Sequence, residues 1–132
     1  MHPSRTQTPE DVVERFSRAY KARRFEDVYD MYSPESEIRR GVDKKQYASK
    51  MRSAVLRTKM EILESKVASS RVEGDTARVT LLSTTKSIVG QWRVEEEFTL
   101  RREGSEWRIT STSKVRQWPV GGGETSAIRG RM

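Results

Sequence analysis

The sequence predicts an α+β fold in which N-terminal helices pack in the concave face of a strongly curved antiparallel sheet. Three observations support this prediction. Apolar residues recur at helical spacing up to about residue 56, apolar and polar residues alternate from about residue 60 to residue 118, and turn residues separate the alternating segments. Because a sheet with one apolar face must bury that face, we expect the helices to cover it.

The helical part divides into three segments. Thr8, followed by Pro9 and two acidic residues, is typical of a helix start. Asp43 starts a later helix and has Gln46 as its capping-box partner. Between them, a shorter helix ends before Pro34, because the residue that precedes a proline avoids the helical conformation. The predicted helices cover about residues 9–21, 25–32 and 44–56.

The alternating part begins with two strands joined by a turn at Gly74. In the first of these strands the apolar residues change face between Ile62 and Leu63, so we expect a bulge there. The second strand alternates more regularly. The two predicted strands cover about residues 60–72 and 77–88.

A long hairpin follows over residues 91–118, with a predicted turn at Glu103-Gly104. With this turn, Phe98 faces Ile109 and Leu100 faces Trp107 across the antiparallel pair. The large apolar side chains then share one face of the sheet, which is why we favour this register.

Length and composition narrow the class of protein. The 132 residues suggest one domain, placed at residues 8–118, with flexible termini at 1–7 and 119–132. The chain has no cysteine and a single histidine, His2, which excludes thiolate chemistry, a histidine base in the core and a multi-histidine metal site. We therefore predict no metal and no cofactor.

The formal net charge of +7 favours acidic partners, but the basic residues are scattered, which favours a solvated surface over nucleic-acid binding. The sequence has no run of 18 apolar residues, so no transmembrane segment is predicted. Its start lacks the apolar core of a signal peptide. A cytoplasmic location is expected for the sequence as it stands, and an exported one if a signal had been removed, so the compartment stays unknown.

Five segments also carry a family resemblance: PEDVVERFSRAY, KARRFEDVYDMYSPES, DKKQYASKM, VEGDTARV and EWRITSTSKV. In this order they resemble the nuclear transport factor 2-like (NTF2-like) superfamily over about residues 8–118. The texture is similar to bacterial lipoprotein-like and transpeptidase-associated members. The resemblance implies a cystatin-like cone whose mouth can hold a ligand, and dimerisation through the outer face of the sheet.

Glu96 lies in the apolar phase of its strand and would point into the cone. It is either an acid-base carboxylate whose pKa is raised by desolvation, or a structural acid paired with an arginine or with serine hydroxyls. We favour the structural role, in which Glu96→Gln lowers stability, because similar isomerases and dehydratases use aspartate or histidine with tyrosine. The residues predicted to line the pocket are Tyr29, Tyr32, Ser83, Thr85, Glu96, Ser111 and Ser113.

Two basic surfaces are further candidates. Arg39 and Arg40 precede Gly41 in a predicted loop near the cone mouth and could bind an anion, although adjacent loop arginines are usually only solvated. The outward face of the sheet suits a dimer or partner contact, and its only aromatic residue is Trp118, so it forms no stacking platform for nucleic acid. The basic residues predicted on this face are Arg78, Arg93, Arg101, Arg108, Lys114 and Arg116.

These patterns leave three functions open. The favoured one is a non-catalytic NTF2-like domain that binds a small apolar or amphipathic ligand, or a protein partner, and forms a homodimer through the sheet. The alternative is a small-molecule lyase, isomerase or hydrolase that uses Glu96. The second alternative is a basic module that binds an acidic polymer.

Overall fold

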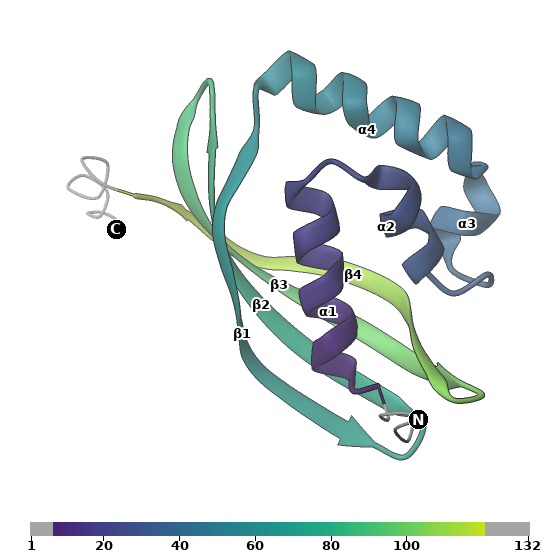
Figure 1. The fold of residues 1–132 in the computed structure, drawn as a ribbon. Coiled ribbons are helices and arrows are strands. Elements are labelled where there is room, and N and C mark those ends of the chain that lie inside the picture. Colours follow the sequence, from purple (N-terminus) through teal and green to yellow (C-terminus); the bar gives the residue numbers. More distant parts are fainter. Residues whose placement is uncertain (1–6, 121–132) are drawn as a thin grey trace, which may run out of the picture.

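The structure, a computed structural model, describes residues 7–120 and confirms the α+β class. Helices come first and are followed by one antiparallel sheet in the order β1-β2-β3-β4. Figure 1 shows α1 lying in the concave side of the curved sheet, with α4 crossing above α1 before it leads into β1. The elements are α1 (Pro9–Lys21), α2 (Phe25–Met31), α3 (Glu37–Gly41), α4 (Lys44–Thr58), β1 (Glu61–Glu73), β2 (Thr76–Ser87), β3 (Gly90–Glu103) and β4 (Glu106–Pro119).

The predicted helix starts of α1 and α4 are confirmed by their capping boxes. The Thr8 hydroxyl accepts a hydrogen bond from the Asp11 N–H at 3.1 Å, and the Asp11 carboxylate accepts one from the Thr8 N–H at 3.1 Å. The Asp43 carboxylate accepts from the Gln46 N–H at 2.8 Å, and the Gln46 side chain accepts from the Asp43 N–H at 3.1 Å. In each box two N–H groups that a helix start would leave unpaired are satisfied.

The prediction that Arg39 and Arg40 lie in a loop is wrong, because they belong to the short helix α3. Ser36 caps this helix, and its hydroxyl accepts a hydrogen bond from the Arg39 N–H at 3.3 Å. The helix ends at Gly41. A helix of five residues has too few positions to show a helical spacing of apolar residues, so only the cap and the glycine signalled it.

The core lies between α1 and the concave face of the sheet. Val12 and Val13 on α1 are fully buried, as are Phe98, Leu100 and Ile109 on the sheet. Each such side chain stabilises the fold by about 1.5–3 kcal/mol relative to an exposed one. The predicted placement of helices over the apolar face of the sheet is therefore confirmed.

The predicted register of the β3–β4 hairpin is wrong. Glu103 pairs with Glu106, so the turn residues are Gly104 and Ser105, and Gly104 takes a φ of 69°, which favours glycine. Leu100 pairs with Ile109 rather than with Trp107.

Two bulges in β4 displace the register further along the hairpin. Leu100 pairs with Ile109 but Thr99 pairs with Ser111, so Thr110 is the extra residue. Beyond this bulge Phe98 pairs with Thr112, not with Ile109 as predicted. A second shift follows between the partners of Glu96 and Glu95. The prediction assumed one uninterrupted alternation, whereas a strongly bent strand uses extra residues to turn.

The predicted bulge in β1 is confirmed, since the register with β2 shifts between Ile62 and Glu64. A second shift between Val67 and Ser69 was not predicted. Extra residues in both edge strands therefore accompany the curvature that forms the cone.

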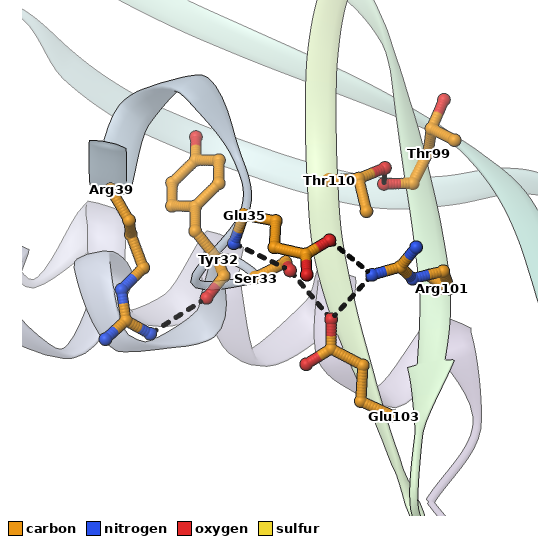
Figure 2. A network of polar contacts seen from close by, with 8 residues as sticks. All are labelled: Tyr32, Ser33, Glu35, Arg39, Thr99, Arg101, Glu103 and Thr110. Atoms are coloured by element: carbon orange, nitrogen blue, oxygen red, sulfur yellow. Dashed lines mark hydrogen bonds and ion pairs between the residues drawn. The ribbon is translucent and has the colours of Figure 1, made fainter. Parts of the chain in front are cut away.

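The segment after α2 is fastened to the edge of β4. Tyr32 forms a parallel bridge with Ile109, and the Ser33 N–H donates to the Ile109 carbonyl at 2.7 Å. Figure 2 shows the side chains that secure this contact: the Ser33 hydroxyl donates to Glu103 at 2.7 Å, and Arg101 pairs with Glu35 at 3.0 Å and with Glu103 at 3.6 Å. The contact covers part of an edge strand that would otherwise present unpaired backbone groups.

The predicted termini at 1–7 and 119–132 fall mostly outside the described residues. At the ends that are described, Gln7 accepts a hydrogen bond from the Trp107 N–H at 2.8 Å, and the Val120 N–H donates to the Gln91 carbonyl at 3.1 Å. Pro119 is the last residue of β4. Regular structure therefore extends one residue beyond the predicted end at Trp118.

Candidate functional site

A cavity of about 410 Å³ lies between the helices and the concave face of the sheet. Its wall is mostly apolar and aromatic. α1, α4 and Tyr32, which directly follows α2, contribute the aromatic side chains on the helical side. The aromatic residues of the wall are Phe16, Tyr20, Tyr32, Tyr47 and Trp92.

The structure brings four of the seven predicted lining residues to this cavity: Tyr32, Ser83, Thr85 and Glu96. The two β2 residues lie in the same phase as buried Leu81, as the alternation of the strand predicts. The Ser65 and Ser83 hydroxyls are 3.1 Å apart, so part of the polar capacity of Ser83 is used within the sheet.

The other three predicted lining residues lie outside the cavity. Tyr29 is buried, but its hydroxyl donates to the Val42 carbonyl at 2.7 Å and so holds the start of α4. Ser111 and Ser113 are exposed because the bulge at Thr110 turns them away from the concave face.

The inward positions of β4 are taken by Thr112 and Lys114, which line the cavity. Lys114 was predicted on the outward face, and that prediction is wrong for the same reason: the bulge at Thr110 exchanges the two faces of the strand. Nothing in the sequence marks the bulge, because Thr110 sits in a run of small hydroxyl residues that suit either face.

Glu96 is half-buried and lines the cavity from β3. Burial raises the pKa of its carboxyl, while the positive charge of Lys114 and hydrogen bonding to Thr112 act in the opposite direction. Within residues 7–120 it forms no ion pair, so the predicted arginine partner is not there. The predicted serine partners are replaced by the threonine hydroxyl.

Three tyrosines surround the same space. Burial, with a smaller contribution from the nearby charge of Glu96, raises the pKa of Tyr20 and of Tyr32 to about 12. Burial also raises the pKa of Tyr47, and the neighbouring tyrosines add to this effect. The phenol groups therefore stay protonated at physiological pH and remain hydrogen-bond donors.

Aromatic contacts hold these rings in place. The Phe16 ring lies 5.9 Å from those of Tyr20 and Tyr32, and the Tyr32 ring lies 6.5 Å from that of Tyr47. Phe16, Tyr20 and Tyr47 stand at the helical spacing of apolar residues, which predicts only that they lie on buried helix faces. Helical spacing shows that a residue faces inward, but it does not show whether the side chain meets another side chain or open space.

The candidate anion ligands Arg39 and Arg40 do not converge on one site. The Arg39 guanidinium donates to the Tyr32 carbonyl at 3.1 Å and lies over the Tyr29 ring at 5.1 Å, so its role is to hold the helices together. Arg40 lines a separate polar hollow that also contains the acidic residues Glu35 and Glu37. The mixed charges of that hollow give no special preference for an anion.

Within residues 7–120, no group of histidine, cysteine, aspartate and glutamate side chains is arranged to hold a metal ion. None of the helices in this range is long and apolar enough to cross a membrane.

No protein-family model and no curated protein sequence matches the chain. Solved structures do match it. A SEC-C motif containing protein from Rhodopseudomonas palustris superimposes with a TM-score of 0.66 at 18% identity, over 83% of this chain and 80% of that one. An NTF2-like protein with a cystatin-like fold from Novosphingobium aromaticivorans gives 0.57 at 15% identity, over 80% and 77% of the two chains.

The chain has the NTF2-like fold. A third similar structure is a hypothetical protein with a ketosteroid isomerase-like protein fold from Catenulispora acidiphila, in complex with trimethylamine. It gives a TM-score of 0.57 at 15% identity and covers 83% of this chain and 87% of that one. The NTF2-like resemblance of the sequence is thus confirmed for the fold, and at such identities a shared fold carries no function by itself.

Proposed function

We propose that this NTF2-like protein binds a small amphipathic organic molecule in the cone cavity without transforming it. One observation carries the proposal: a cavity of about 410 Å³ combines a largely apolar, aromatic wall with a single carboxylate and several protonated phenol groups. Small-molecule sites are typically apolar hollows of roughly 300–1,000 Å³ with a few polar groups that fix orientation.

The polar groups of the cavity favour a ligand with one polar end. Glu96 and Thr112 come from neighbouring strands, and Tyr32 lies against them from the helical side. Together they offer both donors and acceptors, which suits a hydroxyl, carbonyl or amine group, while the apolar part of the ligand packs on the aromatic wall. The Catenulispora acidiphila protein, which has a similar fold, is in complex with trimethylamine, and this supports small-molecule binding by this fold.

A binding role ranks above a catalytic one because of the neighbours of Glu96. The other titratable groups in the wall are Lys114 and tyrosines that burial keeps protonated. Proton-transfer chemistry works best with groups whose pKa values lie near the working pH. Glu96 would have to supply that chemistry alone.

The proposal is tested by filling the cavity. Ser83→Phe places a large side chain in the wall, whereas Thr80→Phe adds the same side chain to the opposite face of β2. Titration with the apolar dye Nile red should give similar affinities for the wild type and Thr80→Phe, and an affinity at least about tenfold weaker for Ser83→Phe. Equal affinity for all three proteins, with unchanged circular dichroism, would contradict binding in the cavity.

A catalytic role for Glu96 is the second candidate, and the raised pKa of its carboxyl is the observation that favours it. A lyase or isomerase that uses this group would remove a proton next to a carbonyl. Small ketones incubated with the protein in deuterium oxide would then exchange those protons, as followed by NMR, and Glu96→Gln would abolish the exchange. Exchange at the uncatalysed rate is the expected result for a binding protein.

A further inference from the structure

The end of the molecule where the β2–β3 turn meets α4 carries the most exposed large apolar side chains of residues 7–120. Leu56 is 72% exposed, Ile88 is 65% exposed and Val89 is 72% exposed. We call these three residues the apolar rim. The Ile88 N–H donates to the Thr58 carbonyl at 3.0 Å, which fixes the turn against the C-terminal end of α4, and Figure 1 shows both elements at one end of the molecule.

The apolar rim adjoins the cavity mouth. Val89 lines the cavity, as do Ser87 just before it and Trp92 just after the turn. Met60, in the link between α4 and β1, is part of the same wall. The apolar surface is therefore continuous from the exposed turn to the interior of the cone.

Three cationic residues flank the rim residues along the chain. Arg57 and Lys59 follow Leu56 on the chain, and Lys86 precedes the β2–β3 turn. All three are exposed, and none forms an ion pair with another residue in the range 7–120. Glu61, which faces Lys86 across the β1–β2 pair, is the acidic residue near them. The rim thus combines aliphatic side chains with an excess of positive charge, in a chain whose net charge is +7.

The shape of the rim decides what kind of partner fits it. Its foremost part is a tight turn between two strands, and a turn offers far less area than the roughly 800 Å² that each partner of a stable protein complex buries. Exposed aliphatic side chains flanked by lysine and arginine suit the boundary of a lipid bilayer, where side chains enter the acyl region and cations meet anionic headgroups.

We propose that the apolar rim docks on an anionic lipid bilayer, with the Ile88-Val89 turn inserted among the headgroups and the flanking cations on their phosphates. Docking places the cavity mouth against the lipid surface, so an amphipathic molecule passes between bilayer and cavity without crossing water. The inference goes beyond the proposed function, and vesicle binding is measured without any ligand, so the two proposals fail separately.

The apolar part is tested by flotation of the full chain with vesicles of phosphatidylcholine, with and without phosphatidylglycerol. The double variant Ile88→Ser/Val89→Ser is compared with Val72→Ser, which removes a 50% exposed valine near the β1–β2 turn. We expect the wild type and Val72→Ser to float with the anionic vesicles, and the double variant to bind at least about tenfold more weakly. Equal binding by all three proteins would overturn the proposal, as would a wild type that does not float.

The charged part is tested with two variants of equal net charge. Lys59→Glu/Lys86→Glu reverses two rim cations, and Arg71→Glu/Arg78→Glu reverses two exposed arginines that pair across β1 and β2 at the other end of these strands. We expect the first variant to lose anionic-vesicle binding and the second to retain it. Equal losses would show that net charge alone draws the protein to lipid, and would overturn a specific rim.

The same set of variants distinguishes lipid docking at the rim from two alternatives, which are a contact between copies of the chain at the rim and lipid binding by residues 121–132. Sedimentation velocity of Ile88→Ser/Val89→Ser shows whether the rim is a contact between copies, since a dimer that dissociates in this variant would overturn the proposal. The variant Arg129→Glu/Arg131→Glu, made in the 132-residue chain, tests the residues after Val120. Vesicle binding lost in that variant and kept in the rim variants would assign lipid binding to residues 121–132, against the proposal.

Discussion

Single residues show both the reach and the limit of sequence patterns. Glu96 stood out because it interrupts an apolar phase, and the structure does place it in the cavity wall. The polar neighbours of Glu96 were predicted wrongly. Serines and an arginine were expected beside it, whereas Thr112 and Lys114 lie there. Strand phase determines the face of a residue on its own strand, whereas its neighbours also depend on every bulge in the next strand.

For Glu96→Gln we expect the stability difference from the wild type to change with pH. Burial raises the pKa of Glu96 in the folded state above its ordinary value of 4.5, so ionisation is easier in the unfolded chain. The wild type therefore loses stability as pH rises from near 4.5 through the folded pKa, and glutamine escapes this loss. Urea unfolding should show Glu96→Gln to be at least as stable as the wild type at pH 8, and relatively less stable at pH 4.

This expectation reverses the one drawn from the sequence, where a paired structural acid predicted a loss of roughly 1–3 kcal/mol on Glu96→Gln. The reason is the missing ion pair within residues 7–120. Glu97→Gln, on the opposite face of β3, is the matched control. A drop of about 1 kcal/mol or more at pH 8 for Glu96→Gln alone would restore the paired structural role.

Phe16 joins the core to the cavity wall. It is buried, and its ring packs edge-on against Phe98 at 5.0 Å and Tyr32 at 5.9 Å. Phe16→Ala should lower the free energy of unfolding by about 3–5 kcal/mol, since it removes these contacts and enlarges the cavity. Leu56→Ala, at an exposed site, should change it by no more than about 0.5 kcal/mol. Similar denaturation midpoints for both variants would contradict the packing of Phe16.

At the scale of elements, a helix or strand pairing was predicted where its local sequence signal was strong and missed where that signal was weak. The starts of α1 and α4 were predicted because a cap and its box partner are chemically specific and lie three residues apart. α3 was missed because one turn and a half of helix shows no periodicity, and the β3–β4 register failed because small polar residues in β4 leave the position of a bulge unmarked.

A substitution at Asp43 shows how much the capping box of α4 contributes to the stability of the fold. Asp43→Ala removes the carboxylate that accepts from the Gln46 N–H, while the backbone N–H of residue 43 still donates to the Gln46 side chain, so the free energy of unfolding should fall by about 1 kcal/mol. Asp27→Ala removes an exposed carboxylate whose ion pair among residues 7–120 is with Arg24, three residues earlier, and its effect should stay below about 0.5 kcal/mol. Thermal unfolding monitored by circular dichroism separates them, and equal Tm values would show that the box contributes nothing.

At the scale of the whole molecule, the fold class and the cone were predictable because the order of amphipathic helices and alternating strands admits few arrangements. The existence and the volume of the cavity could not be predicted from the sequence. They depend on whether side chains such as Tyr20 and Tyr47 meet across the cone, and that distance follows from the curvature of the sheet. The ligand class follows from the groups that converge there, and not from the fold.

The outer face of the sheet has features that favour the predicted homodimer. On this face Thr84 is buried and Leu82 is half-buried, although the helices of residues 7–120 lie on the other side of the sheet (Figure 1). The Nε of Arg93, which pairs with Thr84 across the strands, is buried and has no hydrogen-bond partner in the described part of the chain. A buried donor without an acceptor is costly, so a side-chain rearrangement that pairs this group when a second copy packs on the face would favour association.

We therefore expect a dimer at high micromolar concentration, with a mass by light scattering of twice that of one chain. Leu82→Arg places a charge in the middle of the outer face and should give monomers that keep the wild-type circular dichroism, because the side chain points away from the core. Ser69→Arg, outside the centre of the same face on the edge strand β1, serves as the control and should leave the dimer intact. A wild type that scatters as a monomer would rule out this interface. A dimer that survives Leu82→Arg would place the contact elsewhere, and the rim variant Ile88→Ser/Val89→Ser would then show whether the β2–β3 turn forms it.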